Sequence, residues 1–315
     1  MKQKDNTRLT GRPAISVVVT THQRADLLAR CLAALLAQEA APPYEIVVVD
    51  DGSRDGTRDL AALLDPRVRY HWQENAGRAA ARNKGLELAE GPLLVYVDSD
   101  VFVVPGFLAA HAAAHRRAGG RLVFAQGVSV DVTRPVDPAA PGVPVADPSR
   151  AFFDTKNVSV PTDLLRRAGG FDARFTQYGW EDLEAGMRLR DLGVRKVRAA
   201  GAVGFHYHPA FAPGDLEKLA RLEEERGRMG ARFLALRPTW EVRLMIGLTP
   251  LHHFVFWLMT GGWRRPDGAS PRLVSFLAER PALAALALPG LLAPRGYTAL
   301  RQELAAMSAE NLTGI

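Results

Sequence analysis

Two aspartates separated by a serine follow a run of apolar residues, in the segment LLVYVDSD that ends at Asp100. Alternate residues of an extended segment face the same side, so the carboxylates of Asp98 and Asp100 can point at one site. Two like charges held close together need a cation between them or a raised pKa. A hard divalent cation, Mn²⁺ or Mg²⁺, meets that need, so the pair is predicted to bind one.

Two further polar clusters stand directly after β-branched runs. Residues 20–24 (Thr20, Thr21, His22, Gln23, Arg24) follow ISVVV, and Asp50, Asp51, Gly52 and Ser53 follow YEIVVV. A turn alone would explain Asp-Asp-Gly-Ser, because these residue types favour turns. In an open parallel sheet, however, ligands bind beyond the carboxyl ends of the strands. The three clusters are therefore predicted to meet at one edge of a sheet and to bind a ligand there.

Arg78 and Arg82 recur one turn apart in the helix that opens at Gly77. Phosphates are attracted both by a helix N-terminus and by guanidinium donors. The two arginines are candidate phosphate ligands, and the alternative of a solvated helix face stays open for both.

Glu181 and Asp182 open a later helix, and acidic residues in a first helical turn are explained by the helix dipole alone. Their approach, Tyr178-Gly179-Trp180, is nevertheless aromatic and contains a glycine. A carboxylate beside an aromatic surface that can stack on a sugar is a good general base for a hydroxyl nucleophile. Glu181 and Asp182 are thus candidate catalytic residues, with Trp180 as a candidate sugar contact.

Two histidines, His206 and His208, stand at alternate positions of the segment FHYHP. A single histidine is usually structural, but two near a predicted metal site are candidate ligands. One of them is expected to join the two aspartates.

The elements around these clusters alternate between strand and helix. Apolar runs predict strands at 15–20, 44–49 and 93–97, a further strand is predicted at 68–72, and helices lie between them. The alternation implies right-handed crossovers and a mostly parallel central sheet flanked by helices, an α/β fold. Further on, strand-containing segments at 152–160 and 194–205 surround a helix at 181–192, and residues 135–148 form a surface loop.

The bulk composition narrows the class of protein. The chain has 315 residues, of which 47% are hydrophobic, and a net charge of +6. No Lys/Arg-rich run with interleaved aromatics is present, which argues against nucleic acid as a partner. The N-terminus lacks an apolar signal segment, and a single cysteine, Cys31, excludes an intramolecular disulfide. A cytoplasmic protein with a buried, inert Cys31 is expected.

Three regions are predicted: a polar tail at 1–12, a catalytic domain at 13–212 and a helical C-terminal region at 213–315. The last begins with a charged helix at 215–236 and continues as helices broken by proline and glycine. Its apolar stretches, such as Leu244 to Trp263, hold Pro250 and two histidines and are not expected to span a bilayer. They can lie in the inner membrane surface, near arginines such as Arg264, Arg265 and Arg272, or form a homodimer interface or a cap on the catalytic sheet.

These clusters, in this order, resemble the family 2 glycosyltransferases with the A-type fold. Four segments between about Ile15 and His208 carry the resemblance: ISVVVTTHQR, VVVDDGSRDGT, NAGRAAARNKGLELAEGPLLVYVDSD and GGFDARFTQYGWEDLEAGMRLRDLG. The block from NVSVPTDLLRRAGGFD to GWEDLE also looks like the C-terminal segment of animal-type galactosyltransferases and polypeptide N-acetylgalactosaminyltransferases. The resemblance implies transfer of a sugar from a nucleotide diphosphate sugar to a glycan or lipid-linked acceptor.

The resemblance also implies roles for single residues. It places Thr20, Asp50, Asp51 and Arg82 around the base and ribose of the nucleotide. Asp98 would hold ribose or metal, and Asp100 the metal that bridges the diphosphate. Asp182 would be the catalytic base, with Glu181 contacting the acceptor or sharing that role, and His206, then His208, would be the histidine metal ligand.

One departure from the family pattern concerns the nucleotide base. The first motif usually reads Pro-Thr-Tyr-Asn-Arg, so His22 replaces the customary aromatic residue. A uridine nucleotide is expected, and a single in-line displacement would invert the anomeric configuration.

Other enzyme classes fit less well. A sugar nucleotidyltransferase should show a glycine- and arginine-rich loop after the first strand, and a dinucleotide oxidoreductase should show G-x-G-x-x-G there. Neither motif is present, since that turn reads TTHQRADLL. A non-catalytic sugar-nucleotide sensor should have lost part of the acidic set, which is complete.

Overall fold

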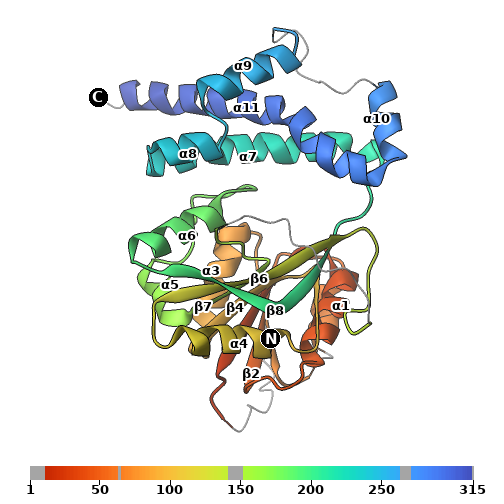
Figure 1. Ribbon diagram of the computed structural model, residues 1–315, viewed down its shortest axis with the longest axis vertical. Helices are drawn as coiled ribbons and strands as arrows, with labels where there is room; N and C mark the ends of the chain where they lie inside the picture. Colours follow the sequence, from red (N-terminus) through yellow and green to blue (C-terminus); the bar gives the residue numbers. More distant parts are fainter. Residues whose placement is uncertain (1–10, 63–64, 141–151, 263–270, 314–315) are drawn as a thin grey trace. The chain divides into compact units, whose positions relative to one another are not determined.

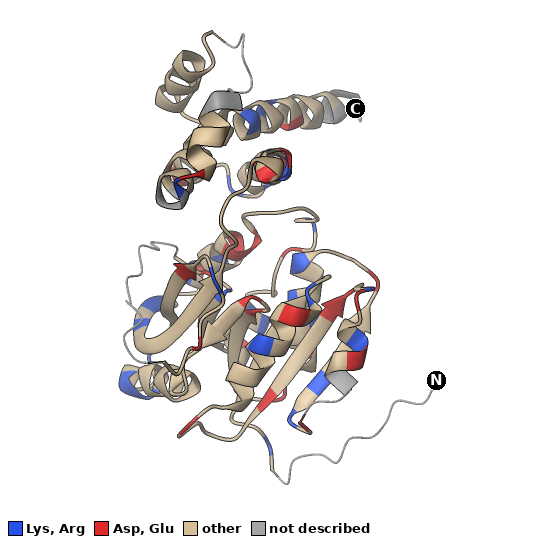
Figure 2. Cartoon of the chain, turned by 90° about the vertical axis from the view of Figure 1, so that its right-hand side faces the viewer, with Lys and Arg blue, Asp and Glu red and all other residues tan. Residues whose placement is uncertain are grey.

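The computed structural model describes residues 11–62, 65–140, 152–262 and 271–313, and it divides into two compact units (Figure 1). The first comprises Met1–Arg174 and Glu181–Pro209, and the second Phe175–Trp180 and Ala210–Ile315. In each unit the charged residues are carried mainly by helices and loops (Figure 2). The domain boundaries expected from the sequence stay a prediction. The short segment Phe175–Trp180, directly before Glu181, groups with the second unit. The tail at 1–10 and the loop residues 141–148 lie outside the described residues.

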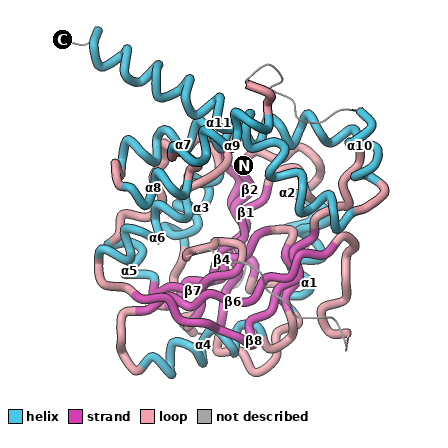
Figure 3. Tube along the Cα trace, turned by 45° about the horizontal axis from the view of Figure 1, so that its top comes forward, coloured by secondary structure: helices cyan, strands magenta, loops and turns pink. Residues whose placement is uncertain are grey.

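An eight-stranded sheet in the order β3-β2-β1-β4-β7-β6-β8-β5 forms the centre of the first unit. Four neighbouring pairs are parallel and three are antiparallel, so the sheet is mixed. Its parallel half, β3 to β4, is the part that the alternating sequence predicted; β4, β7, β6 and β8 lie side by side in Figure 3. The strands are β1 (Ile15–Thr21), β2 (Tyr44–Asp51), β3 (Val68–Gln73), β4 (Leu93–Asp98), β5 (Val101–Val103), β6 (Val123–Val132), β7 (Asn157–Pro161) and β8 (Arg195–Tyr207).

Helices cover both faces of this sheet, which is why its strands are apolar on both sides. Along β1, Val17 and Val19 pack on one face and Val18 on the other. Residues of α1 and α4 pack on the face that carries Val17 and Val19, and residues of α3, α5 and α6 pack on the face that carries Val18. The helices are α1 (Ala25–Leu36), α2 (Thr57–Ala62), α3 (Arg78–Leu88), α4 (Phe107–Ala118), α5 (Thr162–Arg167) and α6 (Glu181–Asp191).

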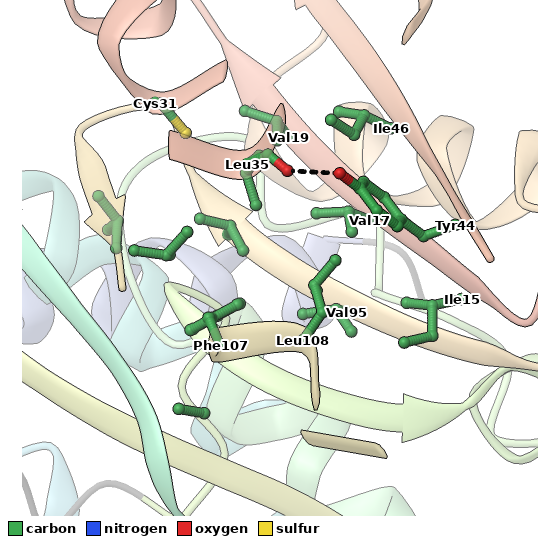
Figure 4. Packing of buried hydrophobic residues seen from close by; sticks show 14 of the residues in the cluster. Ile15, Val17, Val19, Cys31, Leu35, Tyr44, Ile46, Val95, Phe107 and Leu108 are labelled. Atoms are coloured by element: carbon green, nitrogen blue, oxygen red, sulfur yellow. Dashed lines mark hydrogen bonds between the residues drawn. The ribbon is translucent and has the colours of Figure 1, made fainter. Parts of the chain in front are cut away.

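Apolar side chains fill the core between the sheet and α1, and Figure 4 also shows a hydrogen bond within it. Leu28, Leu32 and Leu35 of α1 recur at helical spacing and are fully buried. The Tyr44 hydroxyl at the start of β2 donates to the Leu35 carbonyl, 2.9 Å away. Cys31 is also fully buried, as predicted, and burial raises the pKa of its thiol.

The pairing of β6 with β8 is interrupted by a bulge, at which β8 carries the extra residues. The register between the two strands shifts at Gln126/Val128, and a Cβ at Gly127 would overlap the side chain of Asn157. The Asn157 amide donates to the carbonyls of Val128 and Ala202, each 2.9 Å away. Because Asn157 is fully buried and joins β6, β7 and β8, the strand ends beyond the bulge are held in one register.

The second unit is helical. Its elements are η1 (Pro213–Asp215), α7 (Leu216–Leu236), α8 (Trp240–Met245), α9 (Pro250–Met259), α10 (Pro271–Ala278) and α11 (Pro281–Thr313). Helices α7 and α11 approach closely where Gly227 meets Gly296, because a Cβ at Gly227 would overlap the Gly296 carbonyl. A helical C-terminal region is therefore confirmed.

Candidate functional site

The carboxyl ends of the parallel strands meet at one edge of the sheet, as the sequence predicted. In the strand register Thr20 lies opposite Asp98, and Thr21 lies opposite Asp50. Asp51 lies opposite Gln73 at the end of β3. The three polar clusters are thus neighbours on adjacent strands.

Asp100, two residues beyond β4, is buried and lies among cationic groups. Its Oδ2 accepts a hydrogen bond from the guanidinium of Arg24, whose side chain is 42% exposed. Its Oδ1 lies 3.5 Å from Nε2 of His206 and has no hydrogen-bond partner among the described residues. Burial opposes ionisation, but His206 and Arg24 outweigh it and lower the pKa of Asp100 to about 2. Asp100 is therefore a carboxylate with one buried oxygen available for a cation.

His206 lies between two acidic strand ends because β8 is inserted between β5 and β6. It pairs with Val101 on one side and with Asp131 on the other. Its Nδ1 lies 3.1 Å from Oδ1 of Asp131, while Nε2 faces Asp100. Burial lowers the pKa of this imidazole, but Asp100 and Asp131 outweigh burial and raise it to about 9.

The ligand atoms of Asp98, Asp100 and His206 all lie within 4.8 Å of one another. Those of Asp131, His206 and His208 form a second such group, in which both residues other than His206 are exposed. Carboxylate oxygens and one imidazole nitrogen suit Mn²⁺, and the unpartnered Asp100 oxygen is where a cation would compensate a buried charge. The residues present therefore fit a divalent cation, with the first group as the more enclosed of the two.

Asp131 is the residue of this cluster that sequence reasoning missed. It stands near the end of β6, a strand that was not predicted from the sequence. The signal was present but weak: the pattern Val128, Val130, Val132 alternates with polar residues, and Asp131 falls on the polar set.

Arg82 connects the strand edge to the start of α6. Its guanidinium is buried, 2.6 Å from Oε1 of Glu181 and 3.7 Å from Oδ1 of Asp98. Helix α3 can bring it there because Gly85 lies against Val18 of β1, where a Cβ would overlap the valine. The pairing compensates the charge of the buried arginine, and through Asp98 it joins the candidate cation site to Glu181.

Asp182 is half-buried and its environment disfavours its charge. Burial and the neighbouring charge of Glu181 raise its pKa, Arg82 opposes them, and the net value is about 7. The Leu183 amide donates to its Oδ1 at 2.7 Å. A carboxyl group with this pKa can accept a proton near neutral pH.

Asp50 and Asp51, both buried, hold loops at the strand edge. Asp50 accepts hydrogen bonds from the Tyr70 hydroxyl, at 2.5 Å, and from the Ser53 amide, at 2.8 Å. Asp51 accepts from the amides of Ala76 and Gly77, each at 2.9 Å, and from Gln73. Both carboxylates were expected beside a nucleotide; in the structure they hold the side chains and backbone amides of neighbouring loops.

The other residues predicted to contact the sugar-nucleotide donor differ in how exposed they are. Thr20 is partly buried, whereas His22, Arg24 and Arg78 are exposed at the same end of the sheet. The ring of His22 is fixed by a 2.8 Å contact between Nδ1 and the Asp51 carbonyl. Trp180 belongs to the second unit, where its indole donates to the Arg226 carbonyl and packs against Phe233.

The family described as Glycosyl transferase family 2 matches residues 16–174. Among curated proteins, the validoxylamine A glucosyltransferase of Streptomyces hygroscopicus subsp. limoneus is 35% identical over 221 residues, which cover 58% of this chain and 49% of that protein. The hyaluronan synthase of Pasteurella multocida is 26% identical over 239 residues, covering 62% of this chain and 24% of that protein. The chain spans about half the length, or less, of these relatives.

Among solved structures, the mannosyltransferase PcManGT from Pyrobaculum calidifontis, in complex with GDP-Man and Mn²⁺, superposes with a TM-score of 0.52. The match covers 96% of this chain and 88% of that chain at 23% sequence identity. It confirms the A-type fold. The likeness of the segment after Asn157 to galactosyltransferases stays a prediction, since the family match ends at residue 174.

Proposed function

The chain belongs to glycosyl transferase family 2, and from this premise we propose that it moves a sugar from a nucleotide diphosphate sugar to an acceptor hydroxyl with inversion at the anomeric carbon. The observation that carries the proposal is that Asp98 lies in two neighbouring polar clusters at once. On one side stand Asp100 and His206, and on the other stand Arg82 and the acidic start of α6.

Asp98, Asp100 and His206 are the proposed ligands of Mn²⁺ or Mg²⁺. Bound there, a divalent cation supplies positive charge against the diphosphate leaving group. Asp131 is proposed as the residue that orients His206, because its carboxylate lies at the ring nitrogen that faces away from Asp100. The exposed guanidiniums of Arg24 and Arg78 are proposed as phosphate contacts.

Asp182 is proposed as the general base. Its pKa of about 7 allows it to take the proton of the acceptor hydroxyl as the oxygen attacks the sugar. Glu181 pairs with Arg82 through Oε1, so its proposed role is to contact the acceptor through Oε2, which has no hydrogen-bond partner among the described residues. Its charge also raises the proton affinity of Asp182.

The donor is proposed to be a uridine nucleotide carrying a hexose. A glucosyltransferase among the relatives supports the hexose, and the nucleotide base rests on the resemblance of residues 15–24 and 47–57 to the family motifs. The acceptor is proposed to be a glycan or a lipid-linked sugar, on the cytoplasmic side.

The test is a panel of UDP- and GDP-sugars assayed for nucleotide release and transfer, with and without Mn²⁺. The Asp182→Asn variant serves as the matched inactive control. NMR of the product should show an inverted anomeric configuration, and a retained configuration would overturn direct displacement. If the protein binds sugar nucleotides but transfers sugar to none of the acceptor classes, the result would assign it a sensor role instead.

A further inference from the structure

Helix α9 of the second unit is turned with its polar side chains inward. His253 reaches α11, where its Nδ1 lies 2.9 Å from the Tyr297 hydroxyl. His252 pairs with the hydroxyl of Thr249, which caps the helix. Phe256 packs against the same tyrosine ring, with centroids 5.3 Å apart. The face of α9 that contacts the rest of its unit is therefore the one that carries its imidazoles.

The opposite face of α9 is apolar and exposed. Leu251, Phe254, Val255 and Leu258 stand at helical spacing i, i+3, i+4, i+7, and their exposed fractions run from 39% to 69%. Trp257 and Met259 extend the surface at 44% and 41%. A surface helix of a soluble protein shows the reverse arrangement, with apolar residues inward. We call Leu251, Phe254, Val255 and Leu258 the "α9 stripe". Their exposure fits an apolar environment.

Exposed apolar residues are concentrated in the second unit. Of the fourteen large apolar side chains that are exposed among the described residues, three lie in the first unit and are scattered: Trp72, Leu122 and Leu192. The other eleven lie in the second unit, eight of them between Trp240 and Met259. Single exposed apolar residues are ordinary, whereas a contiguous set marks an interaction surface.

The charges around the stripe favour an anionic lipid surface over a protein partner. From Leu244 to Trp263 the sequence holds no Asp, Glu, Lys or Arg, and in Figure 2 the helix that leads into the grey segment 263–270 is wholly tan. The nearest charged residue on each side of this uncharged stretch in the sequence is an arginine, Arg243 before it and Arg264 after it, with Glu241 and Asp267 further out. Trp240 and Trp257 add the amphipathic rings that favour the headgroup region.

The stretch does not cross a bilayer as one helix. Trp240–Met259 has the length and a mean hydropathy, 1.3, that a span requires. The structure divides it into α8, of 6 residues, and α9, of 10 residues, with Gly247 between them in a left-handed conformation at φ +74°. A span needs about 20 continuous helical residues.

We propose that the α9 stripe docks the protein onto an anionic lipid bilayer, lying in its surface with the exposed Arg243 at the headgroups. This inference does not depend on the proposed sugar transfer, because it concerns a surface of the second unit. It would bring an enzyme of this kind to acceptors that are held in a membrane.

The test is flotation of the full chain with vesicles of phosphatidylcholine alone or with about three parts in ten phosphatidylglycerol. The variant Leu251→Gln/Leu258→Gln removes two stripe leucines, and Leu122→Gln/Leu192→Gln makes the same change at two exposed leucines of the first unit. Both pairs are exposed, so circular dichroism should show an unchanged fold. The wild-type chain and the control should float with the anionic vesicles, and the stripe variant should partition about tenfold or more weakly.

Two outcomes would overturn the proposal. One is a wild-type chain that stays at the bottom of the gradient at low salt, or a stripe variant that floats as well as the control. The other is a dimer in light scattering that the stripe variant, but not the control, converts to monomer without any vesicle binding. That result would assign the α9 stripe to a second copy of the chain.

Discussion

The carboxylate of Asp131 lies 3.1 Å from Nδ1 of His206, so the end of β6 determines which ring nitrogen of the histidine faces Asp100. A hydrogen bond to one imidazole nitrogen sets the role of the other. The position of the proposed cation therefore depends on three strands, β4, β6 and β8, and not on the Asp-x-Asp segment alone.

Replacing Asp131 should weaken cation binding without unfolding the protein. We expect Asp131→Ala to lose about tenfold in Mn²⁺ affinity, the lower end of the range for residues that orient metal ligands. Asp131→Asn, which keeps an oxygen near the ring, should lose less. Electron paramagnetic resonance titration of Mn²⁺ measures this without any sugar substrate. The exposed Asp59→Asn should match the wild type, and an equal loss there would point to a general charge effect.

Removing the cation, or its most buried ligand, should abolish transfer. Asp100→Asn removes the carboxylate charge and replaces one oxygen with an amide NH2 group, which cannot bind a cation; Oδ1 of Asp100 has no hydrogen-bond partner in the part of the chain that the structure describes. We expect little activity from this variant at any Mn²⁺ concentration and none from the wild type in excess chelator. Full turnover in chelator would show that the three groups form an ion-pair cluster and not a cation site.

The pH dependence of transfer should report Asp182. The base works only when ionised, so the rate should rise through the pKa of about 7 and level off above it. Glu181→Gln should move this limb to lower pH, because a neighbouring negative charge that disfavours ionisation is removed and Arg82 loses its partner. The exposed Glu74→Gln should leave the limb in place. A limb that moves upward in Glu181→Gln would contradict the assignment.

The same carboxyl should make the protein less stable as pH rises. Because its pKa in the folded protein, about 7, exceeds the ordinary aspartate value of 3.8, the native state binds the proton more tightly than the unfolded state. The stabilisation is complete below about pH 4 and is lost as the pH rises to about 7. Asp182→Asn carries no charge at any pH, so its Tm should exceed that of the wild type at about pH 8 by a few degrees and approach it in acid. Differential scanning calorimetry at several pH values checks this.

Arg82 should matter for stability far more than Arg78, one turn away on α3. Arg82→Met leaves the buried carboxylate of Glu181 without its partner, at a cost of about 3–5 kcal/mol in the free energy of unfolding. The exposed Arg78→Met should change it by about 0.5 kcal/mol or less. Urea unfolding of both variants compares them directly, and equal costs would contradict the buried pairing.

The sequence predicted those parts of the site that depend on local pattern. Continuous apolar runs define β1, β2 and β4, and parallel pairing then places Thr20, Asp50 and Asp98 at one edge. The helix that begins at Glu181 was equally clear. These predictions needed only the period of the apolar residues and the known geometry of parallel sheets.

The missing parts depend on packing between distant segments. No element was predicted between residues 101 and 134. The strands there are hard to recognise, because β5 has only three residues and Gln126 and Gly127 interrupt the apolar pattern of β6. Without β6, Asp131 had no place in the sheet. Nor could the sequence show that Arg82 pairs with a carboxylate 99 residues away, or that the Trp180 ring packs against Phe233.

The insertion of β8 between β5 and β6 also sets when the site can exist. His206 arrives more than a hundred residues after Asp98, and contacts of such separation close late in folding. A nascent chain on the ribosome has the Asp-x-Asp pair early, but the proposed set of cation ligands is incomplete until Tyr207 has been synthesised and β8 has entered the sheet. The proposed chemistry is thereby coupled to completion of the sheet, and a truncated product that ends before β8 lacks the means to carry it out.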